Sequence, residues 1–413
     1  MIVNLLEKGN NIIDGFADKK ALLVFLFYKA ISDRYLAELE NIEKEKPNLK
    51  DIKKYLIANV RTLNLYDVDN KKLLIWHNVK NSPNEFINAL NKILELNKNT
   101  LAKLRKLMEN TNFYSLFEGE NKIILEKLIN LFSKADFSKL DYNTLEDTYK
   151  WILQQFTSEK QVYTPREVSK LLAYLIEPQD EEVILDPACS FASTLREIYM
   201  YAKNKDKNAN IVLVGQEQNE IASLLAELNF ILSKMKNAKV FTGDFSVYPK
   251  FKEEIKKFYK DGKADKVVAN LINLNPNKIK TINHYARKMG AIVIDNNSLS
   301  NEEKDKNIRE NFVKNDIIDA VILLPQKTLN NCKIIVLNKE KKDKRKGKIL
   351  FINASKFNSL SEKNIKKIAK IYKEFKEEKG ISKIVDIKNI EKNKFNLDVS
   401  LYTPSKNKIF RKL

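Results

Sequence analysis

The stretch Val183-Ile184-Leu185-Asp186-Pro187-Ala188-Cys189 decides the fold, because a short apolar run ends there on a carboxylate and a turn. After this stretch, further short apolar runs alternate with amphipathic helical periods. Such alternation is typical of a parallel sheet with helices on its faces. We therefore predict strands at residues 183–185, 211–214, 239–241, 266–269, 291–294, 320–324 and 334–337.

Helical periods dominate the part of the chain that precedes this sheet. Asp18 is a candidate cap for a helix that runs through residues 21–27 to Leu36 and is apolar nearly all round. A helix of that kind is typical of the centre of a bundle. Further helices are predicted at Pro83–Leu96, 101–108, 122–132 and Tyr142–Phe156, and, among the strands, at 195–203 and 220–233.

The C-terminal part is less regular. A charged stretch at 339–348 separates the last predicted strand from the apolar run 349–352, which indicates either the tip of a basic hairpin or a solvated turn. A long helix is predicted at 362–379, with Gly380 as its stop. The tail at 395–403 shows no periodicity.

The composition limits the kinds of partner and site. A formal charge of +20 suits a polyanion such as DNA, but lysine is abundant throughout, as in proteins of AT-rich genomes, so a generally basic surface is the alternative. Two cysteines and two histidines form neither a disulfide nor a zinc pattern, so we expect no metal. We find no signal peptide and no apolar run near the N-terminus approaching the roughly 20 residues that span a bilayer, and we expect a cytoplasmic protein without membrane contact.

Polar side chains follow the predicted strands where ligands bind in an open parallel sheet, beyond the carboxyl ends. Asp186 ends the first strand. Glu217 follows the second, in Gly215-Gln216-Glu217, where a carboxylate accepts hydrogen bonds from ribose hydroxyls. Asp244 follows the third and suits an adenine amine, and Asn270 follows the fourth. Their order and spacing are more specific than any one of them.

Several motifs stand in a fixed order along the chain: Phe25-Leu26-Phe27-Tyr28-Lys29-Ala30-Ile31-Ser32-Asp33-Arg34, Tyr163-Thr164-Pro165-Arg166-Glu167-Val168, Asp186-Pro187-Ala188-Cys189, Gly215-Gln216-Glu217, Lys346-Gly347-Lys348-Ile349-Leu350-Phe351-Ile352-Asn353-Ala354-Ser355 and Asn396-Leu397-Asp398. With these motifs the chain resembles, over essentially its whole length, the modification subunit of type I restriction-modification systems, a DNA adenine methylase family.

The resemblance implies an α/β protein, in which an N-terminal helical bundle (1–158) precedes a Rossmann-like S-adenosylmethionine-dependent methyltransferase domain (159–360) and a C-terminal helix and tail (361–413). It implies S-adenosylmethionine as cofactor, a flipped-out adenine in DNA as substrate and a DNA specificity subunit as partner. The family's positions assign Asn270 to catalysis, and they assign cofactor binding to Tyr163, Thr164, Asp186, Ala188, Glu217 and Asp244.

The chain departs from the family at three places. Where relatives carry Gly-Thr-Gly-Gly in the cofactor loop, this chain has Ser190-Phe191-Ala192-Ser193, so glycine freedom is lost and Phe191 adds bulk. Where relatives carry Asn-Pro-Pro and an aromatic residue, it has Asn270-Leu271-Ile272-Asn273, so both prolines and the stacking ring are missing. The loop at 324–332 is shortened and lacks glycine.

These departures predict a catalytically inactive homologue with weakened cofactor binding, which acts as a DNA- and partner-binding subunit. DNA contacts are expected from lysines in the cleft between domains, and an active methyltransferase paralogue or a restriction subunit are further expected partners. The alternatives are an active adenine methyltransferase with a rebuilt pocket, and a non-enzymatic regulator or decoy in antiviral defence. For single residues, helix capping by Thr164, a local hydrogen bond of Asn270 and tight packing of Cys189 are the structural alternatives.

Overall fold

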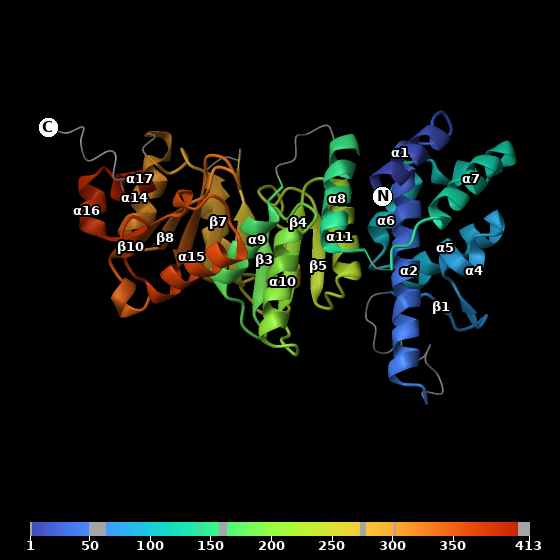
Figure 1. The fold of residues 1–413 in the computed structure, drawn as a ribbon, viewed down its shortest axis with the longest axis horizontal. Coiled ribbons are helices and arrows are strands. Elements are labelled where there is room, and N and C mark those ends of the chain that lie inside the picture. The colour runs from blue at the N-terminus through green and yellow to red at the C-terminus, as the bar shows by residue number, and fades with distance from the viewer. Residues whose placement is uncertain are drawn as a thin grey trace. The chain divides into compact units, whose positions relative to one another are not determined.

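A computed structural model of the chain describes residues 2–48, 63–138, 140–156, 163–272, 278–300 and 303–403. The chain divides into two compact units (Figure 1). Unit 1 comprises Met1–Gln161 and Glu220–Lys236, and unit 2 comprises Val162–Asn219 and Asn237–Leu413. Residues Glu220–Lys236, which lie in the sequence between two strands of the sheet, therefore belong to unit 1 and not to the sheet unit.

Unit 1 is built around α2 (Leu22–Glu45), in which residues 22–32 are buried without a break. The prediction of a central helix is therefore confirmed, and Asp18 accepts a hydrogen bond from the Lys20 amide at the start of the preceding turn. The other elements are α1 (Ile2–Ile13), η1 (Lys19–Ala21), the ribbon β1 (Tyr66–Asp67) and β2 (Lys72–Leu73), α4 (Trp76–Val79), α5 (Pro83–Leu96), α6 (Ala102–Asn110), η2 (Phe113–Phe117), η3 (Gly119–Asn121), α7 (Lys122–Ser133), α8 (Tyr142–Phe156) and α11 (Glu220–Leu232).

The motif at the middle of α2 has a structural role in unit 1. Lys29 is buried and forms an ion pair with Asp33, whose carboxylate also accepts a hydrogen bond from the Phe137 amide at 2.9 Å. Arg34 donates to the Ser138 carbonyl at 2.9 Å. These contacts tie the segment after α7 to α2, because buried polar groups require partners.

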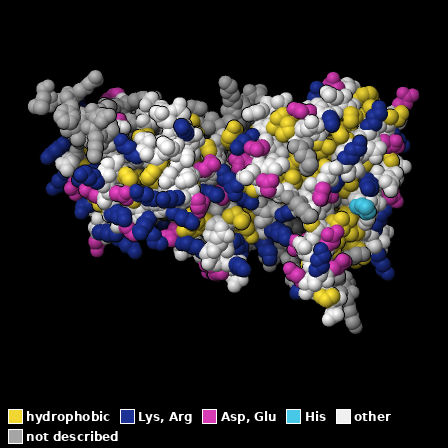
Figure 2. Space-filling model, viewed as in Figure 1, with side chains coloured by type: hydrophobic (Ala, Val, Ile, Leu, Met, Phe, Trp, Pro, Cys, Tyr) yellow, Lys and Arg dark blue, Asp and Glu magenta, His cyan; other side chains and the backbone are white. Residues whose placement is uncertain are grey.

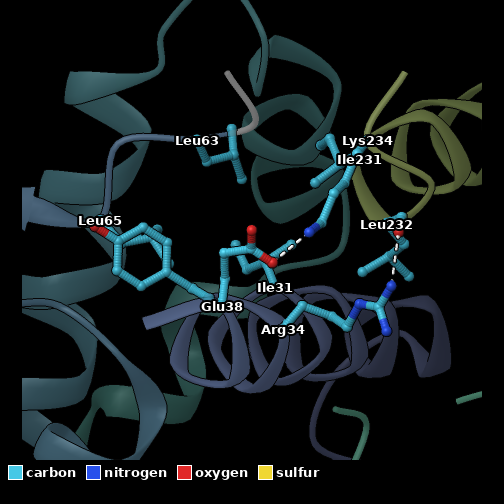
Figure 3. A pocket seen from close by; sticks show the side chains of 9 residues that line it. Ile31, Arg34, Glu38, Leu63, Leu65, Ile231, Leu232 and Lys234 are labelled. Atoms are coloured by element: carbon cyan, nitrogen blue, oxygen red, sulfur yellow. Dashed lines mark hydrogen bonds and ion pairs between the residues drawn. The ribbon is translucent and has the colours of Figure 1, made fainter. Parts of the chain in front are cut away.

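A second set of contacts ties α11 to the same helix (Figure 3). Arg34 donates to the Leu232 carbonyl at 3.2 Å, and Lys234 forms an ion pair with Glu38. Between these two contacts lies a small cavity, which Ile31, Leu63 and Leu65 also line. Its apolar walls and narrow interior fit a packing gap in unit 1 better than a ligand site.

Unit 2 contains one nine-stranded sheet in the order β11-β10-β8-β9-β7-β6-β3-β4-β5. Strands β3 to β7 are mutually parallel, β9 runs antiparallel to both β7 and β8, and β11 is antiparallel to β10. The strands are β3 (Val183–Asp186), β4 (Val212–Glu217), β5 (Ala238–Thr242), β6 (Ala264–Asn270), β7 (Ala286–Asp295), β8 (Ile318–Leu323), β9 (Cys332–Asn338), β10 (Lys348–Asn353) and β11 (Ser382–Asp386).

Helices pack on this sheet and form its core. Figure 1 shows α9 (Arg166–Ile176), α10 (Ser193–Lys205) and α15 (Glu362–Glu374) side by side over the strands. All four residues of β3 are buried, as a strand covered on both faces requires. The remaining elements are α12 (Phe251–Ile255), α13 (Lys278–Tyr285), η4 (Glu303–Asp305), α14 (Lys306–Lys314), η5 (Asp343–Arg345), η6 (Ala354–Lys356), α16 (Ile387–Lys392) and α17 (Val399–Tyr402).

The structure corrects two predictions at the C-terminal end. The helix α15 ends at Glu374 rather than near Gly380, because Phe375 takes a left-handed conformation (φ 48°) and is buried against the Arg345 guanidinium, 4.6 Å from its ring. The stretch 339–348 is not a hairpin tip, since β9 and β10 both pair with β8 and not with each other. It is not simply solvated either, because Lys341 and Arg345 within it are buried.

The buried cations of that stretch bind carboxylates and carbonyls. Arg345 donates to Asp319 at 2.6 Å and to the Tyr372 carbonyl at 2.6 Å. Lys341 donates to Asp316 at 2.7 Å and to the Ile318 carbonyl at 2.6 Å. The charged stretch, predicted as a hairpin tip or a solvated turn, therefore links β8 to α15. Over the described ranges, none of the helices is both long and apolar enough to cross a membrane.

Candidate functional site

The four strand-end residues predicted from the sequence meet at one edge of the sheet. Strands β6, β3, β4 and β5 are neighbours in that order, and all four run in the same direction. Asp186, Glu217 and Asn270 are the last residues of β3, β4 and β6, and Asp244 follows the end of β5. The chain proceeds from β3 outward in both directions, which makes this edge the topological switch point where ligands bind.

The loop between β3 and α10 keeps a backbone suited to glycine. Ser190 and Ala192 have φ angles of 48° and 62°, in the left-handed region that side chains disfavour. These are two of the positions at which the family carries glycine. The loop is closed by the Ala192 amide, which donates to the Cys189 carbonyl at 2.7 Å. The ring of Phe191 is fully buried, so it does not project from the loop into open space.

The Glu217 carboxylate holds the ends of β3 and β4 together. One oxygen accepts from the Ser190 amide at 2.8 Å, and the other accepts from the Asn219 amide at 2.8 Å. The carboxylate therefore stands between the cofactor loop and the turn that follows β4.

The Asp186 carboxylate is enclosed by protein. Burial raises its pKa to about 7, and the nearby Glu217 charge acts in the same direction, while a hydrogen bond from the Ala188 amide opposes the shift. Asp186 is therefore a group whose proton depends on pH near neutrality. Ala188 itself is half-buried and packs against the core of unit 2.

Asp244 lies in a different environment. One of its oxygens accepts from the Ser246 amide at 2.8 Å and from the Ser246 hydroxyl at 2.6 Å, and the Lys278 ammonium lies 3.9 Å away. Partial burial acts to raise the pKa of Asp244, but the Ser246 hydrogen bonds and the Lys278 charge lower it overall. Asp244 is thus a stable carboxylate at the edge where the resemblance places adenine recognition.

The side chain of Asn270 is held at both ends. Its Nδ2 donates to the Thr164 hydroxyl at 3.0 Å, and its Oδ1 accepts from the Ile272 amide at 3.2 Å. Thr164 therefore does not cap α9, whose N-cap position is Pro165 without a side-chain hydrogen bond. Tyr163, next to it, is half-buried. Residue 273, the last of the catalytic motif positions, lies outside the described residues.

Sequence reasoning missed Gln216, which is fully buried and organises the same edge. Its Nε2 donates to the Gly243 and Tyr248 carbonyls at 2.9 and 3.0 Å, and its Oε1 accepts from the Phe251 amide. Nothing in the sequence indicated this role, because glutamine is common on protein surfaces and only the structure shows that Gln216 is buried. Cys189 is a packed residue as expected, since a β-carbon at Gly215 would lie 2.8 Å from its Sγ.

The residues at this edge fit an adenosine-type cofactor. The Ser190 Oγ is buried without a hydrogen-bond partner, directly beside the amide that binds Glu217. A buried hydroxyl without a partner is uncommon, and a ligand atom is one way to satisfy it. Two carboxylates, Glu217 and Asp244, stand at the ends of β4 and β5. Among the described residues, no group of histidine, cysteine and acidic side chains is arranged to hold a metal ion.

On the face drawn in Figure 2, a band of Lys and Arg side chains lies over the part of unit 2 that includes α15. Most of these lysines have acidic neighbours. Lys366 pairs with Glu362, Lys370 with Glu374 and Lys373 with Glu177. Exposed pairs of this kind contribute little to stability, but they reduce the net potential that a polyanion would meet.

The comparisons with known proteins agree with this geometry. The family model for N-6 DNA methylases matches residues 140–275 and 277–409. A type I restriction enzyme methylase subunit of Methanocaldococcus jannaschii, MjaVIII, is 48% identical over an alignment of 450 residues that spans 97% of this chain and 77% of the relative. A second subunit of that organism, MjaVII, is 37% identical with the same coverage. Since the alignment with MjaVIII is longer than the 413-residue chain, the relative carries residues where this chain has gaps.

Among solved structures, the methyltransferase subunit of a type I restriction-modification system from Streptococcus thermophilus superposes with a TM-score of 0.71. The two sequences are 19% identical, and the match covers 97% of this chain and 99% of that one. At this identity the likeness shows the fold, which is the mixed α/β fold with a mostly parallel central sheet predicted from the sequence.

Proposed function

The chain belongs to the N-6 DNA methylase family, as a homologue of type I restriction enzyme methylase subunits, and from this premise we propose that it has lost methyl transfer and retains DNA and partner binding. In this proposal the chain keeps the architecture of the family, but its catalytic motif no longer presents the target base to the cofactor.

The hydrogen bonds of Asn270 carry this proposal. In the family pattern, position 272 is proline, which has no amide N–H. Here Ile272 supplies that N–H, and it donates to Asn270 Oδ1 at 3.2 Å. The acceptor that would orient the amine of the target adenine is therefore engaged within its own turn. Replacement of the first proline by Leu271 also removes the rigid turn that would hold this geometry.

We expect cofactor binding to be better preserved than methyl transfer. S-adenosylmethionine, when bound, supplies the electrophilic methyl group. Glu217 would bind the ribose hydroxyls, and Asp244 would accept from the adenine amine. Ser190 and Ala192 place side chains where glycine allows the closest approach, so we expect an affinity below that of intact relatives.

The partners follow from family membership. The two archaeal relatives are methylase subunits of type I restriction enzymes, so we propose that this chain also works within a complex on DNA, in the cytoplasm. A specificity subunit is the first expected partner, and an active methyltransferase paralogue or a restriction subunit are the next.

An active adenine methyltransferase with a rebuilt pocket is the second candidate. The left-handed conformations of Ser190 and Ala192 favour it, because they preserve the course of the cofactor loop without glycine. The two candidates share the cofactor site and differ at Asn270, so an assay of methyl transfer separates them.

Reconstitution tests the proposed role. The full chain is co-expressed with the specificity subunit that accompanies MjaVIII, and MjaVIII itself is the matched positive control. We expect a stable complex that binds duplex DNA with a steep salt dependence, because phosphate contacts release counterions. A chain that neither joins the specificity subunit nor binds DNA, under conditions in which MjaVIII does both, refutes the proposed scaffold role.

A further inference from the structure

A polar hollow lies at the opposite edge of the sheet from the candidate cofactor site. Strands β6 and β7 begin there and β9 ends there, since β9 is antiparallel and the Lys339 amide donates to the Lys288 carbonyl at 2.8 Å. The hollow has a volume of about 520 Å³ and is open to solvent. Its polar walls include Tyr259, Lys263, Asp265, Arg287, Lys288 and Lys339.

Two acidic side chains of the hollow are already neutralised. Asp265 accepts from Tyr259 at 2.6 Å and pairs with Lys288 at 3.0 Å. Asp261 pairs with Arg287 at 3.0 Å. The third, Glu340, is exposed at the rim.

The other cations of the hollow have no such compensation. Within the described ranges, Lys263 forms no ion pair, and its side chain is half-buried. Lys339 donates to the Asn283 and Ala286 carbonyls at 2.5 and 2.6 Å and to no carboxylate of those ranges. These two carbonyls use two of its three N–H donors and leave the third for a ligand. Lys252 lies against the turn at Gly262, next to Lys263.

The cations at this edge that lack a carboxylate partner among the described residues lower the pKa values of their neighbours. Burial lowers the pKa of Lys339, and the Lys263 charge lowers it further. Burial likewise lowers the pKa of His284, which stands at the end of α13, and Lys263, Lys339 and Lys252 add to this effect, while Asp261 opposes it. Repulsion among cations costs free energy that a bound anion would recover.

We propose that this hollow is a binding site for a phosphoryl group, held by Lys263, Lys339 and the Arg287 guanidinium. Arg287 is fixed for this role by its stacking on Tyr259, 4.4 Å from the ring centre, and a guanidinium matches the geometry of phosphate oxygens. The site lies on the order of 20 Å from Asn270, the length of the seven-residue strand β6 at about 3.3 Å per residue. It is therefore separate from the cofactor and base positions and does not depend on the proposed loss of catalysis.

His284 provides the readout, because the chain contains only two histidines and His77 in unit 1 serves as an internal reference. The full chain is titrated with inorganic phosphate, at ionic strength matched with sodium chloride, while the histidine ring signals are followed by NMR across pH. A His77→Asn variant assigns the two signals. We expect phosphate to raise the pKa of His284 by about 0.5 to 1, the effect of one or two negative charges at several ångströms in a solvated site, and to leave His77 unchanged.

Variants and a second ligand complete the test. Lys263→Ala should abolish the response, Lys263→Arg should retain it, and Lys388→Ala, at an exposed position of α16, should leave it unchanged. A short DNA duplex in place of phosphate distinguishes the sources of the phosphoryl group: a response to DNA alone supports a backbone phosphate, and a response to free phosphate supports a small ligand. If neither ligand moves His284, or if Lys263→Ala responds like the unmodified chain, the proposal is overturned.

Discussion

Replacement of Ser190 by glycine should stabilise the fold, which is unusual for a loop substitution. Three contributions set the expected size. A side chain in the left-handed region costs about 1 kcal/mol or more, which glycine removes. The buried Oγ without a partner costs roughly 1 kcal/mol or more, which glycine also removes. Against this, glycine gives the unfolded chain freedom worth about 0.5–1 kcal/mol. The free energy of unfolding should therefore rise by about 1 kcal/mol or more.

Two further variants separate these contributions in urea unfolding experiments. Ser190→Ala removes the hydroxyl and keeps the strained backbone, so it should gain about 1 kcal/mol. Ser169→Ala is the control, because its buried hydroxyl is hydrogen-bonded to Thr194 at 3.0 Å and its loss should destabilise by about 1 kcal/mol. Destabilisation by Ser190→Ala would contradict the prediction, since the hydroxyl would then have a partner. A Ser190→Gly variant clearly less stable than Ser190→Ala would also contradict it, since the backbone would then not be strained.

Three other perturbations follow from single contacts. Ile272→Pro removes the amide that donates to Asn270 and should lower the free energy of unfolding in urea by about 1 kcal/mol. Ile272→Ala keeps that hydrogen bond and should cost less. Equal losses would contradict a stabilising role of this hydrogen bond. Because burial raises the pKa of Asp186 to about 7, above its unfolded value, the folded state holds a proton that the unfolded state has released, so stability should fall as the pH rises from about 4 to about 7. Asp186→Asn should remove that slope, and an unchanged slope would exclude Asp186 as its source. Arg345→Met leaves the fully buried Asp319 carboxylate without its cation and should cost about 3–5 kcal/mol, with Arg345→Lys costing less; a loss under 1 kcal/mol would show that the pair is not buried in solution.

The sheet was predictable because most of its strands are short, largely buried apolar runs. Every predicted strand range overlaps a strand of unit 2, and Pro83–Leu96 and Tyr142–Phe156 match α5 and α8 end to end. Strand β11 was missed because it lies at the edge of the sheet, where Lys383 and Asp386 are exposed and break the apolar run. The ribbon of β1 and β2 has only two residues in each strand and offers no periodicity.

The sequence predicted which residues lie at the site, but it did not predict the hydrogen bonds between them. Asp186, Glu217, Asp244 and Asn270 meet at one edge because parallel strands place their carboxyl ends together. The bond between Asn270 and Thr164 joins residues far apart in the chain, which no local pattern encodes. Likewise, the sequence could not tell which lysines of a lysine-rich chain are neutralised. The cluster around Lys263 and Lys339 becomes visible only through its geometry.

The proposed function differs from that of the relatives because the chain departs from the family's catalytic pattern at Leu271, Ile272 and Asn273. On the proposed loss of catalysis, the engaged Asn270 acceptor and the missing ring would deprive the target base of orientation and of a stacking contact worth about 1–3 kcal/mol. These losses act on the reaction rate and need not affect the fold, the DNA contacts or the subunit interface.

Methyl transfer itself tests this account most directly. The reconstituted complex is incubated with radiolabelled S-adenosylmethionine at saturating concentration and duplex DNA carrying the site of the specificity subunit, and methyladenine is counted over time. With MjaVIII in place of this chain as the reference, we expect transfer to be about a thousandfold slower or undetectable. Transfer within about tenfold of the reference would contradict the account and would establish the chain as an active adenine methyltransferase with a rebuilt pocket.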